Sequence, residues 1–519
     1  MLLFTGGPVY TMDLLRPTAG AVLVRGERIA AVGEAARLRA LAPAAEEIDL
    51  DGRALLPGFV DAHSHLAAAA YRSLLADLAP PPVGPCRTPA DVAAALGAFL
   101  QAHPPGPGQW LMGMGYDESA QGGRPTRQML DQISRQVPIA AVHRSGHLCV
   151  CNSRALALLG KEAADGLLAE GAFLDPAVQR RMRGPGEEEM VRAVGATARV
   201  YAAAGYTTVQ EARADAALLP LLEGANRRGL LPVDVAAYLP VELARQHPPD
   251  RAGAVHYRGR LRRAGCKLFL DGSPQGRTAW LTRPYHQSPP GEGAGYCGAP
   301  ALTDAALFAH LDECAANAWP VQVHVNGDAA LDQLLRVWAR VCRRRPGAAA
   351  QRPVAVHCQT ARGDQLSRMP RLGLIPSFFV EHIVHWGEFY RAVALGEERA
   401  EAISPVGLAR RLHLPYTLHQ DCPVLPPHPL AMVQAAALRR TAAGRVLGDD
   451  LRVPAAEAIF SLCQNAAWQL FEQGRKGCLR PGYQADLTIW PADPLTAAPD
   501  RLSALRPALV YSRGRRVET

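Results

Sequence analysis

Histidines, one lysine and one aspartate stand where apolar runs end in the central part of the chain. The stretch LLPGFVDAHSHLAAA places His63 and His65 two residues apart at the end of an apolar run. Residues i and i+2 of a strand point to the same side, so both imidazoles would enter one space. Later runs carry further donors at similar places: Lys267 in CKLFLDG, His324 in VQVHVNGD, His357 in VAVHCQ and Asp421 in TLHQDCP. Four imidazoles, a carboxylate and an amine suit zinc or another borderline divalent ion.

Lys267 is unusual because the chain uses arginine almost everywhere else. There are only three lysines, Lys161, Lys267 and Lys476, against 53 arginines. Burying an ammonium inside an apolar strand is costly unless it is paired or neutralised. One solution is an ion pair with Glu211 or Asp271. The other is carboxylation by CO2, which gives a carbamate able to bridge two metal ions. The residues leave both solutions open, and the neighbouring donors favour the carbamate.

Short apolar runs alternate with helical segments through the middle of the chain, which predicts parallel strands joined by right-handed crossovers. After GFVDAHSH, the expected strands lie at 138–144, 207–212, 232–239, 265–273, 320–328, 354–360, 374–382 and 415–421. This alternation fits an α/β fold, a closed (β/α)8 TIM-like barrel, whose strands converge at their C-terminal ends on the active-site face. A doubly wound open sheet is the alternative, but no glycine-rich dinucleotide turn supports it. A single histidine at a strand end is more often a core or rim residue than a metal ligand. The repetition of such donors at several strand ends favours a metal site.

The two ends of the chain differ from the middle. Residues 1–56 and 470–519 contain short strand-like runs with turns at Gly26 and Gly514, and they predict a small composite β-sandwich domain built by both termini. The barrel then spans 57–469. A proline-rich segment at about 72–137 is expected to be an insertion that covers the active site, and 274–300 reads as a long loop.

Composition narrows the class of protein. The 519 residues are 48% hydrophobic and 20% charged, as in an ordinary globular chain. The net charge is +8, but the arginines are scattered, so no nucleic-acid partner is expected. Eleven cysteines without a regular framework indicate a reduced, cytoplasmic protein. There is no signal-peptide pattern and no apolar run of about 20 residues, so no membrane association is expected.

Several motifs together resemble those of one family. They are PGFVDAHSH, CKLFLDGSPQGRTAWLTRPY, VHVNGDAALD, VHCQ, HQDCPV, GRPTRQMLDQI, HLCVCNSRAL and KGCLRPGYQADLTIW. This set is similar to the amidohydrolase superfamily, and within it to the YtcJ-like branch (amidohydrolase family 3), which includes N-substituted formamide deformylases. The resemblance covers nearly the whole chain from Leu56 onward.

The resemblance implies a centre of one or two metal ions, most often zinc. Carried onto this chain, it makes His63, His65 and Asp421 ligands of the more buried ion. His324 and His357 would bind the second ion, and a carbamate on Lys267 would bridge the two. The usual HAIGD reads HVNGD here, EHAQ reads VHCQ, and GSDAPV reads HQDCPV. The ligand positions survive these departures, so they bear on the substrate more than on the metal.

The expected reaction is hydrolysis of a non-peptide C–N bond, an amide or N-substituted formamide, by a metal-bound hydroxide. Asp421 would act as general base, or alternatively as a ligand only. His382 would hydrogen-bond the substrate or the oxyanion. The remaining candidates for substrate contact are Trp110 and Asp117 in the insertion, Arg277 in the long loop, and His385 near the strand-end His382.

Two other functions stay open at this stage. A cyclic amidase or amidine deaminase of the same superfamily often uses one metal and lacks the bridging lysine, so Lys267 argues against the deaminase. A catalytically inactive scaffold paralogue would have lost ligands, and none of the six is lost. The partner is expected to be a small-molecule substrate. A homodimer is compatible with such a fold, although no residue pattern indicates one.

Overall fold

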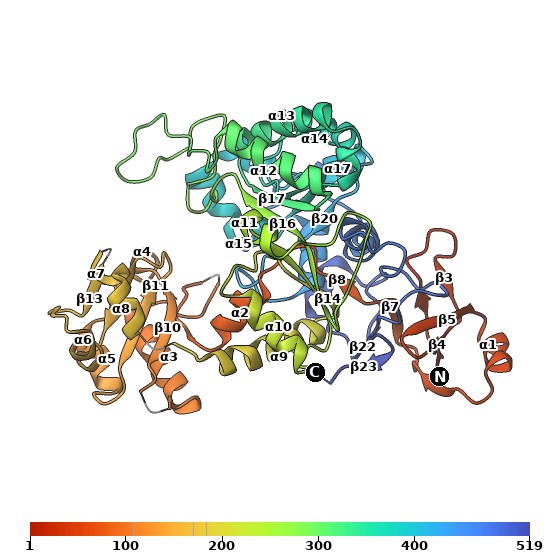
Figure 1. Ribbon diagram of the computed structural model, residues 1–519, viewed down its shortest axis with the longest axis horizontal. Coiled ribbons are helices and arrows are strands. Elements are labelled where there is room, and N and C mark those ends of the chain that lie inside the picture. Colours follow the sequence, from red (N-terminus) through yellow and green to blue (C-terminus); the bar gives the residue numbers. More distant parts are fainter. Residues whose placement is uncertain (82, 107, 170, 183, 519) are drawn as a thin grey trace. The chain divides into compact units, whose positions relative to one another are not determined.

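The computed structural model describes residues 1–81, 83–106, 108–169, 171–182 and 184–518, which form two compact units (Figure 1). The first unit comprises Met1–Leu66 and Ala198–Thr519, and the second comprises Ala67–Thr197. All six predicted metal ligands belong to the first unit. The second unit is therefore an insertion that interrupts the first unit after its first barrel strand.

The first unit contains an eight-stranded parallel sheet whose spatial order follows the chain. Its strands are β8 (Phe59–Val60), β14 (Tyr206–Glu211), β15 (Asp234–Leu239), β16 (Leu261–Phe269), β17 (Val321–Val325), β18 (Val354–His357), β19 (Ile375–Phe378) and β20 (Thr417–Leu418). Beyond the two outermost strands, the backbone N–H of His65 donates to the carbonyl oxygen of Cys422 at 2.8 Å. The predicted TIM-like barrel is confirmed.

Helices follow the strands along the chain. They are α10 (Leu219–Arg227), α11 (Val241–Gln246), α12 (Asp304–Asn317), α13 (Asp328–Arg344), α14 (Gly363–Leu372), α15 (His382–Phe389), α16 (Glu397–Glu401), α17 (Val406–Arg411), α18 (Pro429–Leu438), α19 (Ala455–Phe460) and α20 (Ala466–Gln469). In α12 the Thr303 side chain caps the first turn, and buried Leu307, Leu311 and Cys314 form one apolar face. No helix among the described residues is long and apolar enough to cross a membrane.

The chain between β16 and α12 is a long loop, as predicted for 274–300. It contains neither helix nor strand from Leu270 to Thr303. Its polar anchors include Asp271, whose carboxylate accepts hydrogen bonds from the backbone N–H groups of Trp280, Asn326 and Gly327 at 3.0, 3.0 and 2.7 Å. The loop is thereby attached to the segment that follows β17.

Both termini build one β domain in the first unit, as predicted. One sheet has the order β5 (Arg28–Gly33), β4 (Ala21–Arg25), β1 (Leu2–Thr5), β6 (Glu46–Asp49). The other has the order β23 (Arg515–Arg516), β22 (Leu509–Ser512), β21 (Leu487–Trp490), β7 (Ala54–Pro57), β2 (Val9–Tyr10), β3 (Thr18–Ala19). Phe4, Val22, Leu55, Leu487 and Tyr511 share one apolar core, which joins residues from the two ends of the chain.

The second unit has a five-stranded sheet of its own, in the order β13 (Leu167–Ala169), β12 (Leu148–Cys151), β11 (Ile139–His143), β10 (Leu111–Tyr116), β9 (Ala76–Asp77). Its helices are α3 (Pro89–Ala102), α4 (Glu118–Gln121), α5 (Arg127–Ile133), α6 (Ser153–Leu159), α7 (Gly171–Leu174) and α8 (Pro176–Arg181). Two further helices cross the unit boundaries, α2 (Leu66–Ser73) and α9 (Glu187–Ala203).

This sheet corrects one prediction. The strand expected at 138–144 is β11, which pairs with β10 and β12 and is not a barrel strand. The inserted unit also runs to Thr197, well beyond the predicted end at 137. A short apolar run reads the same whether it lies in a barrel or in the middle of any covered sheet, so periodicity could not separate the two cases.

Candidate metal centre

The barrel strands bring the predicted donors to one end because their carboxyl ends are in register. His324 of β17 pairs with the last residue of β16, the strand that carries Lys267. His357 is the last residue of β18 and pairs with the residue after His324. The other donors follow the outermost strands: His63 and His65 after β8, and Asp421 after β20.

His63, His65 and Asp421 form the first group of donors. The Oδ1 atom of Asp421 lies 3.5 Å from Nε2 of His63 and 3.4 Å from Nε2 of His65. That oxygen is buried and has no hydrogen-bond partner among the described residues. Ligands on a tetrahedral zinc with bonds of 2.0–2.1 Å are separated by about 3.3 Å. The spacing and the unsatisfied oxygen therefore fit a divalent ion bound by these three residues.

His324 and His357 form a second pair. Nδ1 of His324 faces Nε2 of His357 at 3.1 Å, and the ring planes are nearly perpendicular at 74°. The other ring nitrogen of His324 lies 2.9 Å from the carbonyl oxygen of Gly272. Two imidazole nitrogens at this separation can serve one ion, and a third ligand would have to complete the site.

Lys267 lies beside the first group. Its Nζ atom is 3.2 Å from Nε2 of His63, and the side chain is buried. Burial lowers the pKa of Lys267 to about 7. Neither carboxylate proposed as its ion-pair partner approaches it within an ion-pair distance among the described residues: Glu211 pairs with His65 at 3.7 Å, and Asp271 accepts backbone N–H groups. The amine is therefore neutral in a large fraction of molecules near neutral pH, which is the form that reacts with CO2.

Known proteins are similar to this chain over most of its length. A model of the amidohydrolase family matches residues 46–518. The chain belongs to the amidohydrolase family. As a member of this family it is an enzyme, a hydrolase acting on carbon–nitrogen bonds. A second model, described as an imidazolonepropionase-like composite domain of bacteria, matches residues 20–45 of this amidohydrolase, within its terminal β domain.

Individual relatives cover nearly all of the amidohydrolase. An N-substituted formamide deformylase from Arthrobacter pascens is 26% identical over 99% of this chain and 97% of its own. The YtcJ protein of Bacillus subtilis (strain 168) is 23% identical over 96% of each chain. The crystal structure of an uncharacterized metal-dependent hydrolase from Pyrococcus horikoshii has a TM-score of 0.79 at 23% identity, covering 96% of this chain and 99% of that one. The resemblance inferred from the motifs is confirmed.

Burial keeps most imidazoles of the amidohydrolase centre neutral. It lowers the pKa of His324 to about 4 and the pKa values of His63 and His357 well below their usual value. Burial would also lower the pKa of His65, but the nearby carboxylates of Asp421 and Glu211 raise it to about 9. For Asp421, burial opposes ionisation, yet the adjacent His65 and the other surrounding imidazoles lower the pKa well below its usual range. Neutral imidazole and ionised carboxylate are the forms that bind a divalent ion.

Two residues that orient these donors were missed from the sequence. Oε1 of Gln322 lies 2.8 Å from Nδ1 of His63, so this nitrogen donates and Nε2 is the one presented to Asp421. His419 lies 3.0 Å from Nδ1 of His357 through its Nε2 atom. Gln322 stands two residues before His324, and His419 stands two before Asp421. The same i, i+2 rule that paired His63 with His65 could have found both.

His382, His385 and Arg277 were predicted to contact substrate, and these roles stay predictions. His382 is buried, its Nδ1 shares a hydrogen bond with the Tyr390 hydroxyl, and burial lowers its pKa to about 3. His385 is partly exposed and lies 3.9 Å from a carboxylate oxygen of Glu381. The guanidinium of Arg277 donates to backbone carbonyl oxygens of the long loop at 2.9 and 3.3 Å.

Trp110 and Asp117 lie in the second unit, and their role toward substrate also stays a prediction. Trp110 is buried in an apolar core that includes Leu156 and Phe173. Asp117 caps α4 through its side chain and binds Arg144 at 2.6 Å. Both side chains therefore already serve the folding of this unit.

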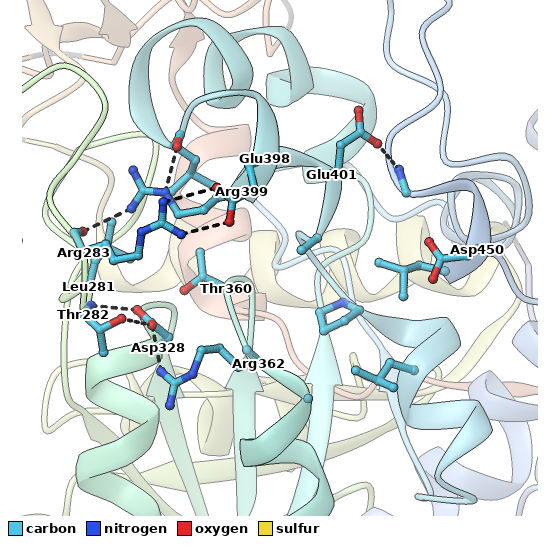
Figure 2. A pocket seen from close by; sticks show the side chains of 18 of the residues that line it. Leu281, Thr282, Arg283, Asp328, Thr360, Arg362, Glu398, Arg399, Glu401 and Asp450 are labelled. Carbon is cyan, nitrogen blue, oxygen red and sulfur yellow. Dashed lines mark hydrogen bonds and ion pairs between the residues drawn. The ribbon is translucent and has the colours of Figure 1, made fainter.

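A cavity of about 840 Å³ lies beside the segments that follow His324 and His357 (Figure 2). Figure 2 shows Asp328 between Thr282 and Arg362, with hydrogen bonds of 2.9 Å from the Thr282 N–H and 2.8 Å from the Arg362 guanidinium. None of the six predicted ligands lines this cavity. The cavity is therefore distinct from the candidate metal centre, and its charged groups are largely paired with one another.

Proposed function

We propose that this amidohydrolase hydrolyses a non-peptide C–N bond of a small molecule, an amide or an N-substituted formamide. The observation that carries the proposal is the group formed by His63, His65 and the unsatisfied buried oxygen of Asp421. The N-substituted formamide deformylase of Arthrobacter pascens supports the substrate class, because its similarity extends over nearly the full length of both chains.

We assign two divalent zinc ions to the centre. His63, His65 and Asp421 would hold the first ion, and His324 and His357 the second. Nitrogen and oxygen donors of this kind suit zinc. A carbamate on Lys267 would supply the shared ligand that both ions need, and the lowered pKa of its amine supports this assignment.

When bound, the ions would supply Lewis-acid activation of a water molecule and of the substrate carbonyl group. The protein has to move one proton in this reaction, from the attacking water to the leaving nitrogen. We assign this task to Asp421, an ionised carboxylate inside the donor group. His382 would donate from Nε2 to the oxygen that gains negative charge, because its hydrogen bond with Tyr390 fixes the ring. This role requires the Tyr390 hydroxyl to donate to Nδ1 of His382 and not to Oε1 of Gln275, which lies 3.1 Å away.

A cyclic amidase or amidine deaminase is the second candidate. Imidazolonepropionase of Streptomyces coelicolor is 50% identical over 54 residues, but this match covers only 10% of the chain. A deaminase with one ion would make no use of Lys267 or of the facing nitrogens of His324 and His357. We therefore rank this candidate below the amidase, and an inactive scaffold paralogue below both.

The remaining proposals concern location and partners. None of the eleven cysteines, all of which lie in the described part of the chain, forms a disulfide. This supports a reducing compartment, so we place the enzyme in the cytoplasm. Its partner would be the substrate and not a nucleic acid or a membrane, and a homodimer is compatible with the fold.

The test is a hydrolysis panel of N-substituted formamides, linear amides, cyclic amides and aminated heterocycles, using metal-loaded and chelator-stripped protein. We expect formamide or amide turnover that is lost on stripping and restored by zinc. Turnover confined to aminated heterocycles would favour the deaminase. Turnover unaffected by stripping would contradict the proposal.

A further inference from the structure

Three buried imidazoles form a hydrogen-bonded chain across the centre. Nε2 of His324 contacts the Gly272 carbonyl oxygen at 2.9 Å, and its Nδ1 faces Nε2 of His357 at 3.1 Å. Nδ1 of His357 faces Nε2 of His419 at 3.0 Å, and Nδ1 of His419 contacts the Ser377 hydroxyl at 2.8 Å. Every ring nitrogen of these three imidazoles therefore has a hydrogen-bonding neighbour.

The carbonyl of Gly272 places the proton of His324 at one end. A carbonyl oxygen only accepts, so Nε2 of His324 carries a hydrogen and Nδ1 has a lone pair. The side-chain nitrogen of Asn326 also lies 3.1 Å from this Nε2, but it donates to the same carbonyl oxygen at 2.8 Å. If Nδ1 of His324 and Nε2 of His357 both serve an ion, then His357 must carry its proton on Nδ1. The atom placed to accept that proton's hydrogen bond is Nε2 of His419. His419 in turn donates from Nδ1 to Ser377.

We propose that His419 is a positioning residue for the second metal ion, acting through His357. It would hold the ring of His357 and keep the lone pair on Nε2, as outer partners of metal-bound histidines do. This inference rests on the proposed two-ion centre. His419 is not itself a ligand in this arrangement, because both of its ring nitrogens are already paired.

Without an ion, the hydrogen bonds that link these three imidazoles can run in the opposite direction. Nε2 of His357 then carries the proton and donates to His324, His419 donates from Nε2 to His357, and Ser377 donates to His419. The number of protons is the same in both states. Binding of the second ion would thus move protons from one ring nitrogen to the other within His357 and His419. It would release no proton from the three rings.

His419 directly follows β20 and is fully buried, and its backbone N–H donates to the carbonyl oxygen of Phe378, the last residue of β19. Removing it would leave the N–H of His357 buried without a partner, which is unfavourable for the tautomer that binds metal.

The test is a zinc titration of metal-free full-length protein against a competing chromophoric chelator, in bicarbonate buffer. We expect two binding steps in the unaltered protein. His419→Ala should weaken the second step by about 10–100-fold and leave the first unchanged. His419→Gln should keep most of the affinity, since its amide oxygen can accept from His357. His310→Ala, on α12, serves as a control that should change neither step.

Ser377→Ala provides a second variant should His419→Ala fail to fold, and it should weaken the second step in the same direction. Two unchanged steps in His419→Ala, or equal losses in both steps, would overturn the role of His419. A single step in the unaltered protein would overturn the two-ion centre itself. These outcomes separate failure of this inference from failure of the proposed function.

Discussion

Asp421 has two tasks in this account, since it is both a ligand and the proton carrier. Its buried Oδ1 faces the nitrogens of His63 and His65, and its charge is stabilised by the imidazoles around it. An amide in its place would be nearly the same size but uncharged. The consequences of that change can be separated from effects on folding.

We predict that Asp421→Asn loses the first ion and reduces kcat by roughly 10²–10⁴-fold. The measurement is steady-state hydrolysis together with metal content. Asp304→Asn is the matched control, because Asp304 forms an exposed ion pair with Arg336 at 2.9 Å. Asp421→Asn with activity within about tenfold of the unaltered enzyme would contradict the assignment.

Lys267 gives a prediction about CO2. Because its amine is buried, with a pKa of about 7, it should form a carbamate only when CO2 is supplied. Protein stripped and reloaded in CO2-free buffer should take up fewer ions, and bicarbonate should restore the second. Lys267→Met should not respond to bicarbonate, whereas the partly exposed Lys161→Met should behave as the unaltered protein. The same ion content with and without bicarbonate would rule out a carbamate.

The raised pKa of His65 predicts that the affinity of the centre for metal depends on pH. Its pKa in the metal-free centre is raised to about 9, so below that pH the imidazolium must lose a proton before it can bind an ion. Apparent affinity for the first ion should rise with pH by about tenfold per unit between pH 6 and 8. Glu211→Gln, which removes one cause of the raised pKa, should shift this dependence to lower pH. Competition with a chelator at each pH measures the affinity of the unaltered protein and of Glu211→Gln. An affinity that does not change with pH would show that His65 is not a ligand.

At the scale of elements, part of this structure follows directly from sequence patterns. The barrel strands β14 to β19 are short buried apolar runs, and the polar residues at their ends predicted where the donors lie. Strand β11 has the same apolar character, so only its pairing with β10 and β12 assigns it to another sheet. His419 was missed because it was interpreted as a departure from a motif. Its position two residues before the predicted ligand Asp421 was not considered.

A buried charge network joins the barrel strands to the segment before β21. Nζ of Lys476 lies 2.6 Å from the Thr208 hydroxyl of β14 and 2.7 Å from the carboxylate of Asp234 at the start of β15. Glu472 lies 3.4 Å from the same amine, and Arg513 of the terminal domain lies 2.8 Å from Asp234. Replacing Lys476 would leave the buried carboxylates of Asp234 and Glu472 with less positive charge beside them.

We predict that Lys476→Met lowers the free energy of unfolding by about 3–5 kcal/mol, because a buried ion pair loses one partner. Urea unfolding measures this effect. Lys161→Met, which removes a lysine 3.7 Å from the carboxylate of Asp175 near the surface, should change it by less than about 1 kcal/mol. Similar effects of the two substitutions would show that the network does not stabilise the fold.

At the scale of the whole molecule, the two units have separate cores. The second unit packs apolar residues on both faces of its own sheet, in one group around Leu156 and Phe173 and another around Leu96 and Leu130. Such a unit should fold without the barrel. The sequence alone suggested a shorter insertion ending at 137, which would omit β11, β12 and β13.

We predict that a fragment spanning 67–197 folds and unfolds cooperatively, as followed by circular dichroism during heating. A fragment spanning 72–137 keeps β9 and β10 but loses their central partner β11, so it should show no cooperative transition. Folding of the shorter fragment, or failure of the longer one, would contradict the division into these two units.

Elemental analysis of purified protein gives the number of divalent ions per chain, which decides whether the centre holds two ions. We predict two ions, mainly zinc, in the unaltered protein and one in His324→Ala, where the donors of the first ion remain. An ion content near zero, in protein that still hydrolyses its substrate, would contradict the account.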